Sequence, residues 1–489
     1  MGNIALNEDD RDFFSVLSKV VYSNPFDDER VAIIKLLSPE YKIDLARPDH
    51  QFNWIAPALN ERIAKLESNG LSTIRCVQDK DRQVMEDVFL FQIYLRFVES
   101  FDKLINSQAL KPNISLNVPF AEEAISQFIN RGFTDQDSLN YFAFFYQIRR
   151  AYYFIVNSLI GSSSSMQQLR CRLWTNIFTQ DLKNYSKSLW HRMEDFSTML
   201  LGGTGTGKGS AAAAIGRSGF IPYDPKKGKF SENFVEIFIS INLCQFSENL
   251  IESELFGHRK GSFTGAVDEH KGVFELCSKH GALFLDEIGD VSVPIQIKLL
   301  RVLQDRIFTS IGSHDEKQFK GRVIAATNHD ISNLRKIGQL RDDLYYRLCS
   351  DVITFPTLQQ RIRESTSELE ILVESLITRI TGEQNIDLND LVLDTLKKNT
   401  SKDYAWPGNV RELEQAVRSV ILTHNYTSDS NCTNLNLGDE FLHDFQAGAF
   451  TVSDLISRYC NTLYQRYGSY EEVARRTKLD RRTVKKYLQ

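Results

Sequence analysis

Residues 198–210 read Thr-Met-Leu-Leu-Gly-Gly-Thr-Gly-Thr-Gly-Lys-Gly-Ser. An apolar run is followed by a glycine-rich loop and then by a segment that predicts a helix from Ser210 to Arg217. Glycines let several backbone N–H groups converge on one phosphate, and the helix N-terminus adds partial positive charge. This strand-loop-helix context favours a phosphate-binding loop over a glycine-rich turn without nucleotide. The predicted nucleotide contacts are Gly202, Gly203, Thr204, Gly205, Thr206, Gly207, Lys208, Gly209 and Ser210.

Gly209 departs from the usual pattern of such loops. Most place Ser or Thr there, and its hydroxyl helps to hold Mg²⁺. Ser210 is the neighbouring candidate for that role. Lys208 is expected to reach the β- and γ-phosphates.

An acidic pair follows a second apolar run downstream. Ala282-Leu283-Phe284-Leu285 precedes Asp286 and Glu287. Such a pair is also common as a solvated strand end, but the apolar run and the upstream loop favour catalysis. Asp286 is predicted to hold Mg²⁺, and Glu287 to polarise the attacking water as a general base.

Short apolar runs alternate with helical patterns from about 168 to 425, which is typical of a doubly wound α/β core. From Phe355 onward the pattern is helical only, which predicts a lid. The chain is therefore predicted to be multi-domain, with an α-helical N-terminal domain, an α/β P-loop ATPase with a helical lid, and a C-terminal helix-turn-helix. The expected domains are 1–165 (regulatory), 168–425 (ATPase, lid about 356–425), 426–449 (linker) and 450–489 (helix-turn-helix). The candidate strands are 198–201, 235–241, 282–285 and 323–326.

The N-terminal region reads as helices, because apolar residues recur at i, i+3 and i+4. Aromatic residues are dense from Tyr141 to Tyr146, and rings at helical spacing are far more often core than a ligand site. Gly161-Ser162-Ser163-Ser164-Ser165 predicts a flexible junction by composition. A phosphorylatable receiver domain is not expected, since no early strand ends in an acidic cluster.

The hexapeptide Gly261-Ser262-Phe263-Thr264-Gly265-Ala266 lies between the two nucleotide motifs. Together they resemble the central domain of the sigma-54-dependent transcriptional activators, which are AAA+ ATPases. In that family the hexapeptide is usually Gly-Ala-Phe-Thr-Gly-Ala and contacts sigma-54 RNA polymerase, and the position of Gly209 is commonly Glu. The resemblance implies a loop with Phe263 and Thr264 at its tip.

Further site residues are implied by the same resemblance. Asn242 corresponds to a switch residue that hydrogen-bonds the catalytic Glu, and Asn328 to the sensor that reads the γ-phosphate. Arg341 and Arg347 correspond to arginine fingers that reach a neighbouring subunit, which implies a homo-oligomeric ring, expected to be a hexamer. Arg411, in the lid motif 406–414, corresponds to the second sensor. Residues 358–361 read Leu-Gln-Gln-Arg, a departure from the usual Leu-Arg-Glu-Arg.

The C-terminal end is basic. Residues 466–489 hold eight Lys or Arg against three acidic residues, although the whole chain has a net charge of −5. This concentration is typical of phosphate-backbone binding. Ser469 predicts a capping box, and Asp480 is expected to cap a second helix. The unit resembles a Fis-type helix-turn-helix, and the helix at 452–467 is expected to pair two such units into a dimer. The predicted DNA contacts are Arg481, Arg482, Thr483, Lys485 and Lys486.

Composition is ordinary for a soluble protein, with 42% hydrophobic and 25% charged residues. Seven scattered cysteines without a C-x-x-C pair suit a reducing cytosol. We expect no membrane span, no secretion signal and a cytoplasmic protein.

The leading hypothesis is an activator that uses ATP and Mg²⁺, binds upstream promoter DNA and remodels sigma-54 RNA polymerase holoenzyme into the open complex. One alternative is an AAA+ chaperone or DNA-processing motor, which would lack the loop at 261–266. Another is a DNA-binding regulator whose ATPase is impaired by Gly209.

Overall fold

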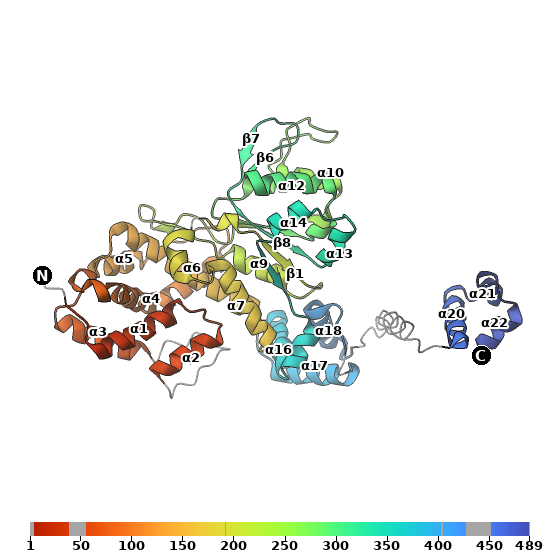
Figure 1. The fold of residues 1–489 in the computed structure, drawn as a ribbon, viewed down its shortest axis with the longest axis horizontal. Coiled ribbons are helices and arrows are strands. Elements are labelled where there is room, and N and C mark those ends of the chain that lie inside the picture. Colours follow the sequence, from red (N-terminus) through yellow and green to blue (C-terminus); the bar gives the residue numbers. More distant parts are fainter. Residues whose placement is uncertain (1–3, 39–54, 191, 402–403, 427–450, 489) are drawn as a thin grey trace. The chain divides into compact units, whose positions relative to one another are not determined.

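The computed structural model describes residues 4–38, 55–190, 192–401, 404–426 and 451–488 (Figure 1). They belong to two compact units, 1–426 and 427–489. The predicted linker at 426–449 lies almost entirely outside the described residues. No helix of the described residues is long and apolar enough to cross a membrane.

The N-terminal region is helical, as the apolar spacing predicts. Long amphipathic helices bury their apolar stripes against one another, and α4 and α6 form the centre of this packing. The helices are α1 (Glu8–Tyr22), α2 (Asp28–Leu37), α3 (Ile55–Ser68), α4 (Asp79–Leu110), α5 (Ala121–Asn130), α6 (Asp135–Ser158) and α7 (Ser164–Phe178).

A five-stranded parallel sheet forms the ATPase core, with strand order β4-β5-β8-β1-β9. Its strands are β1 (Thr198–Leu201), β4 (Phe238–Asn242), β5 (Ala282–Asp286), β8 (Arg322–Thr327) and β9 (Asp351–Thr354). Three expected strands match within two residues, whereas β4 begins at Phe238 and not at residue 235. Val235 donates its N–H to the Asn233 side chain in a turn, so the strand cannot start earlier. Short hairpins pair β2 (Tyr223–Asp224) with β3 (Lys229–Phe230) and β6 (Ile307–Thr309) with β7 (Glu316–Gln318).

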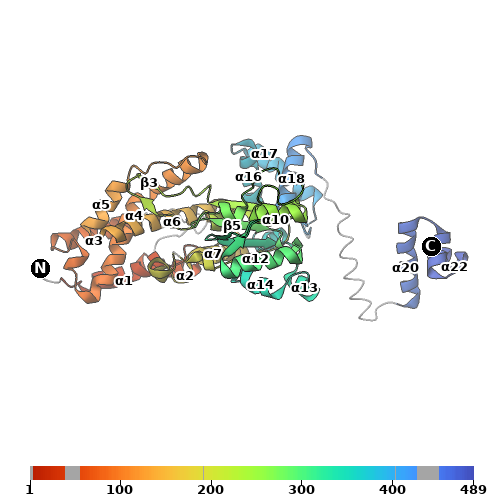
Figure 2. The same ribbon diagram turned by 90° about the horizontal axis from the view of Figure 1, so that it is seen from above.

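Alternate residues of the sheet face two different cores, as strand geometry requires. Phe284 and Ile324 pack with α6, α7 and the P-loop helix α9 (Lys208–Gly216), in the same hydrophobic cluster as the N-terminal helices. Leu283 and Val323 pack on the other face. Figure 2 shows α6 and α7 beside the ATPase core. That second face is covered by α10 (Glu248–Phe256), α11 (Val273–Leu276), α12 (Val293–Asp305), α13 (Ile331–Lys336) and α14 (Asp342–Leu348).

The lid is all helical with a core of its own, as expected. Its helices are α15 (Leu358–Glu364), α16 (Glu368–Thr381), α17 (Ile386–Asn399) and α18 (Asn409–Thr423).

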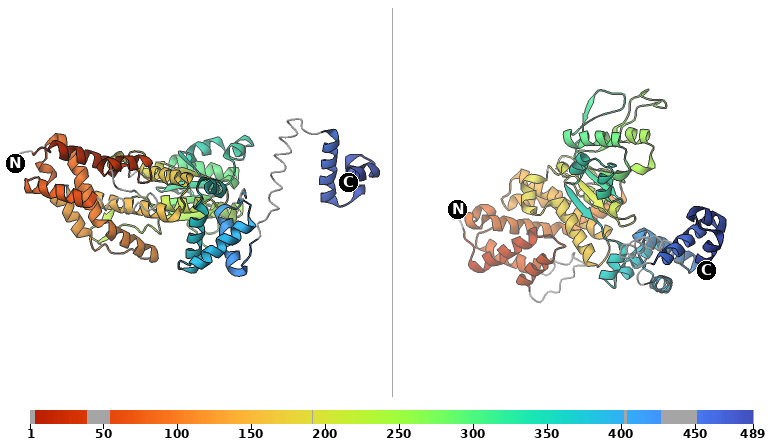
Figure 3. Two further views of the ribbon diagram at one scale, coloured as in Figure 1. Left: turned by 90° about the horizontal axis from the view of Figure 1, so that it is seen from below. Right: turned by 45° about the vertical axis from the view of Figure 1, so that its right-hand side comes forward.

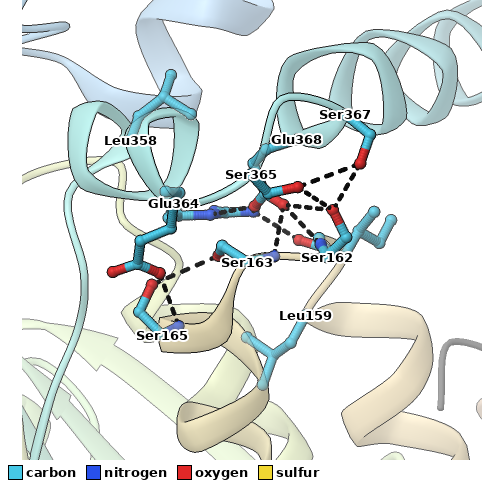
Figure 4. Close-up of polar contacts among 12 residues, drawn as sticks. Leu159, Ser162, Ser163, Ser165, Leu358, Glu364, Ser365, Ser367 and Glu368 are labelled. Atoms are coloured by element: carbon cyan, nitrogen blue, oxygen red, sulfur yellow. Dashed lines mark hydrogen bonds and ion pairs between the residues drawn. The ribbon is translucent and has the colours of Figure 1, made fainter.

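The junction at 161–165 is ordered, so the prediction of a flexible junction was wrong (Figure 4). Glu368, fully buried at the start of α16, accepts hydrogen bonds from the backbone N–H groups of Ser162 (2.5 Å) and Ser163 (2.9 Å). Arg361 of α15 donates from Nε to Glu368 (2.7 Å) and from Nη2 to the carbonyl of Ile160 (2.6 Å). Serine content predicts flexibility only when the backbone has no partner, and here a buried carboxylate from the lid supplies one.

The C-terminal unit contains α20 (Val452–Tyr467), α21 (Tyr470–Thr477) and α22 (Arg481–Tyr487), the blue helices of Figure 3. They pack around Cys460, Val473 and Val484. Asp480 caps α22 as expected, accepting from the N–H groups of Arg482 and Thr483. The capping box at Ser469 is absent among these described residues, because the Glu472 carboxylate binds Arg475 and Arg476 instead.

Candidate nucleotide site and contact loop

The phosphate-binding loop lies between β1 and α9, and α9 begins at Lys208, two residues earlier than expected. The Lys208 side chain is buried and donates from Nζ to the carbonyls of Gly202 (2.6 Å) and Gly203 (3.2 Å). Burial lowers the pKa of Lys208, against the opposing effect of Glu287 and Asp286. The Lys208 ammonium group is thus held against the backbone of the phosphate loop, with the Asp286 and Glu287 carboxylates near it.

Asp286 and Glu287 lie at the carboxyl end of β5, as expected. Burial raises the pKa of Asp286, while Lys208 opposes that rise. Glu287 adopts a left-handed backbone conformation with φ 56°, uncommon for a residue other than glycine. Its Oε2 accepts from the N–H of Asn328 (3.1 Å), and the Asn328 amide reaches Thr204 Oγ1 (3.3 Å). Asn328 therefore connects the acidic pair to the phosphate loop.

Asn242 ends β4 directly beside Asp286 in the sheet register. Its side-chain oxygen accepts from the N–H of Cys244 (3.0 Å), which is the bond of a turn residue. Among the residues that the structure describes, no hydrogen bond joins the Asn242 side chain to Glu287. The switch role of Asn242 therefore stays a prediction.

The lid touches the phosphate loop through its own motif. The N–H of Val410 donates to Gly205 (3.1 Å), and the Asn409 amide donates to the carbonyl of Thr204 (3.0 Å). Asn409 also accepts from the N–H of Leu358 at the start of α15 (2.8 Å). Arg411 follows these residues in α18 and borders the same pocket, and its role as the second sensor stays a prediction.

A pocket of about 370 Å³ joins these elements, bordered by the loop, Asn242, Asp286, Glu287 and Arg411. A further part of its wall comes from residues outside the predicted site. The carboxyl end of α6 and the start of α7 contribute Ser158, Leu159, Ile160 and Met166. No motif marks these residues; the apolar pair Leu159-Ile160 just before the serine-rich junction is the available signal.

The pocket fits a nucleoside triphosphate. Apart from the adjoining residues of the chain, no described atom lies within 4 Å of where a Cβ at Gly207 or Gly209 would stand, so the loop leaves open space where phosphates would lie. Lys208 supplies the cation, and Asp286 with Glu287 supplies the carboxylates by which Mg²⁺ is usually bound beside phosphates. The open space at Gly209 also means that nothing blocks this position sterically.

Arg341 and Arg347 lie outside the described residues that border this pocket. Arg341 stands at the N-cap position of α14 and forms a bidentate ion pair with Asp343 (3.0 and 2.6 Å), while Arg347 is exposed at the end of the same helix. Both are surface groups of one subunit, a position compatible with contact to another.

The hexapeptide 261–266 forms a tight exposed loop between α10 and α11. Gly261 (φ 80°) and Gly265 (φ 107°) both adopt left-handed conformations, as expected for sharp reversals at each end. The N–H of Gly261 donates to the carbonyl of Ala266 (2.8 Å). The Phe263 side chain stays 38% exposed, and its ring packs against the imidazole of His258 with 4.9 Å between the ring centroids. Figure 1 shows this loop rising beside the β6–β7 hairpin, to which Arg259 is joined by a backbone hydrogen bond to Ile311.

Comparison with known families assigns these features. Residues 178–354 match the sigma-54 interaction domain, and residues 363–439 match the AAA+ ATPase lid domain. The ATPase region of the chain therefore belongs to the sigma-54 interaction domain family. Its family motifs fall on the loop, the acidic pair and the lid just described, and the alternative of a chaperone or DNA-processing motor is not favoured.

Relatives of this chain include the nitrogen fixation protein VnfA of Azotobacter vinelandii, 39% identical over 46% of this chain and 40% of that protein. The DNA-binding transcriptional regulator NtrC of Azospirillum brasilense is 38% identical over 53% of this chain and 47% of that protein. The chain thus spans less than half the length of these relatives. A solved structure of NtrX from Brucella abortus in complex with ATP covers 76% of this chain and 80% of that chain, with 20% identity and a TM-score of 0.40, too low to carry an argument.

Proposed function

We propose that the chain is an ATP-hydrolysing transcriptional activator that remodels sigma-54 RNA polymerase from an upstream DNA site. The observation that carries this proposal is the exposed loop 261–266 on a domain that also holds a complete nucleotide pocket. A chaperone or DNA motor needs the pocket but not this loop.

Each of the main pocket residues is proposed to have its own role in ATP hydrolysis. Lys208 would hold phosphate charge, Asp286 would hold Mg²⁺, and Glu287 would take the proton of the attacking water. Mg²⁺, when bound, neutralises charge on the β- and γ-phosphates. Asn328 bonds both Glu287 and Thr204, so it can sense the γ-phosphate and reposition the base.

The exposed arginines suggest how the ring forms. Arg341 and Arg347 would stabilise transition-state charge in the neighbouring subunit's pocket, an effect worth about 10³- to 10⁵-fold in other phosphoryl-transfer enzymes. The homo-oligomer is therefore proposed to be a ring, expected to be a hexamer, with catalytic sites at subunit interfaces.

The C-terminal unit is proposed to bind upstream promoter DNA. In α22 Arg481, Arg482, Lys485 and Lys486 are exposed, while Val484 is buried in the small core. A helix with its apolar side packed and its basic side exposed suits the major groove. Of these residues Arg481 also pairs with Glu471 at the surface (2.9 Å). The helix α20 would pair two units on a palindromic site. We place the domain boundaries as predicted from the sequence and the protein in the cytoplasm, where polymerase and DNA are available.

Three variants test the proposal. Lys208→Ala should lose ATP binding, because the phosphates lose their fixed counter-ion, and Glu287→Ala should bind ATP without turnover. Thr264→Ala should retain ATPase activity and ring assembly, because Thr264 lies outside the pocket, yet fail to form open complexes at a sigma-54 promoter. Nucleotide binding, phosphate release and open-complex formation are measured separately on each. Equal promoter activation by Thr264→Ala and the parent chain would remove the loop as the coupling element.

A further inference from the structure

A pocket of about 390 Å³ lies at the edge of the sheet where strands β5 and β8 begin. Ala282 and Arg322, the first residues of these two strands, line it, whereas the nucleotide pocket lies at their carboxyl ends. Helix α6 supplies Gln147 to the wall, and the carboxyl end of α9 supplies Ile215 and Gly216. The site is therefore separate from the nucleotide pocket, between the N-terminal helices and the ATPase core. Boundaries of this kind are common places for ligands, and the volume is within the range of roughly 300 to 1,000 Å³ typical of small-molecule sites.

Gln147 carries a buried acceptor that the protein does not use. The residue is 1% exposed, and its Nε2 donates to the Tyr185 hydroxyl (2.7 Å) and to the carbonyl of Ser218 (2.9 Å). Because a carbonyl can only accept, the bond to Ser218 fixes which end of the amide is nitrogen. Among the residues that the structure describes, no donor lies within hydrogen-bonding distance of Gln147 Oε1. A buried acceptor without a donor costs roughly 1 to 3 kcal/mol, so a ligand that brings an N–H group would recover that free energy.

Aromatic rings form part of the same wall. Tyr185, Trp190 and Phe220 line the pocket, and the rings of Trp190 and Phe220 meet edge to face with 4.0 Å between their centroids. The Tyr185 hydroxyl is itself one of the two partners of Gln147. Stacked and edge-on contacts between rings are favourable, so a planar ring fits this wall. A ring that carries its N–H in the plane can touch the aromatic side chains and donate to Gln147 together.

The charged side chains that line the pocket are mostly cationic. Four of them are Lys or Arg and two are carboxylates: Lys279, Arg306, Lys320 and Arg322 against Glu194 and Asp195. Arg306 pairs with Asp195 (3.4 Å), and Lys279 and Lys320 are exposed at the surface. A cleft with an excess of one sign of charge concentrates ions of the other sign. The pocket therefore favours a ligand with an acidic group over a neutral or basic one.

We propose that this pocket binds a small anion built on a planar ring with an N–H group, the chemistry shared by a pyrimidine nucleotide and an indole carboxylate. The ring N–H donates to Gln147 Oε1, the ring lies against the aromatic side chains, and the acidic group faces Lys279 and Lys320. The acceptor selects the N–H, and the lysines select the acid.

The test titrates the full chain by calorimetry in the presence of saturating ADP, which occupies the nucleotide pocket. The probes are uridine 5′-monophosphate and indole-3-acetate, each compared with its counterpart methylated at the ring nitrogen. At least one probe should bind saturably, and its methylated form at least tenfold more weakly, because the methyl group removes the donor. The probe that binds identifies the source as nucleotide or carboxylate. Saturable binding of neither probe, or equal binding of a probe and its methylated form, overturns the proposal without any variant having to fold.

Two variants locate the binding. Gln147→Leu removes the acceptor and keeps a side chain of similar size, and it should bind a probe and its methylated form equally. Replacing Lys279 and Lys320 together by Gln should weaken the probe about threefold or more and reduce its salt dependence. Lys336→Gln, at an exposed position of α13 outside the pocket, is the matched control and should bind like the parent chain.

Equal affinity of the double lysine variant and the control, or an unchanged preference for the unmethylated probe in folded Gln147→Leu, overturns the assignment to this pocket. No step needs ATP turnover, DNA or polymerase. The result therefore stands or falls independently of the proposed function.

Discussion

At Gly205 the phosphate loop and the lid approach so closely that no side chain fits between them. A Cβ at this position would lie 2.2 Å from the carbonyl oxygen of Gly408 and 2.9 Å from the Cβ of Arg411. The backbone is also left-handed, with φ 77°, which costs a non-glycine residue roughly 1 to 2 kcal/mol. Gly205→Ala should therefore weaken ADP binding by about tenfold or more, measured by calorimetry on the full chain.

Gly209→Ala is the matched control, four residues further on. No described atom lies within 4 Å of its added Cβ, and its φ is not left-handed. Alanine also has the better helix propensity, by roughly 0.8 to 1 kcal/mol in a helix interior. ADP affinity should stay within about twofold of the parent chain. A loss equal to that of Gly205→Ala would mean that loop flexibility, and not the contact with the lid, sets the affinity.

Residues with a local signature could be predicted from the sequence. Lys208, Asp286 and Glu287 each follow or belong to a motif whose order along the chain fixes its place in the fold. Ile160 has no such signature, because it reaches the nucleotide pocket only through the packing of α6 and α7 on the sheet. The turn bond of Asn242 to Cys244 could not be predicted either, since it depends on the local conformation at the end of β4.

At the scale of elements, a buried ion pair within the lid, between Arg361 and Glu368, binds the backbone of the junction that follows α6. Arg361 and Glu368 are 4% and 0% exposed at their side chains, and Glu368 also binds the two backbone N–H groups at Ser162 and Ser163 (Figure 4). Glu368→Ala should destabilise the chain by about 3 to 5 kcal/mol, because it leaves the Arg361 charge buried without a partner. Nucleotide affinity should fall as well, since Arg361 holds the carbonyl of Ile160 in the pocket wall.

Thermal unfolding and ADP calorimetry measure both effects. Glu370→Ala on the same helix is the control, because its pair with Lys397 is exposed and long (3.4 Å) and worth about 0 to 1 kcal/mol. Replacing Arg361 and Glu368 together by Met should recover most of the stability but not the order of the serine junction. Equal unfolding temperatures for Glu368→Ala and Glu370→Ala would contradict a structural role for the pair.

Local patterns in the sequence predict some of these elements correctly and cannot predict others. Apolar spacing correctly predicts α1, α4 and α6, because a helical stripe is a local property. The serine junction was misjudged because its partners lie about 200 residues away in the lid. The aromatic run 141–146 was predicted to be core, and its rings are largely buried, but a cavity along one stripe of α6 depends on what the other helices leave unfilled.

At the scale of the assembly, a finger supplied by one subunit can serve the pocket of another. Arg341→Ala should abolish turnover while sparing nucleotide binding, because Arg341 lies outside the pocket of its own subunit. Mixing Arg341→Ala with Glu287→Ala should restore part of the ATPase rate, since interfaces form that hold one intact pocket and one intact finger. Phosphate release by the mixture is compared with each variant alone. Absence of recovery in mixtures that co-purify as one assembly would place the arginines outside catalysis.

The C-terminal unit has a core of its own, so its removal should leave the ATPase intact. Cys460, Val473 and Val484 are buried within 451–488, and the ATPase and lid cores draw on none of these residues. A chain ending after residue 449 should therefore keep its ATPase rate within about twofold. It should lose binding to promoter DNA, because the exposed basic residues of α22 are gone. Some activation should return at high protein concentration, since DNA binding mainly raises the local concentration of activator near the promoter. Loss of ATPase on this truncation would mean that the last 40 residues hold the ring together, and the proposed division between a tether and a motor would then be wrong.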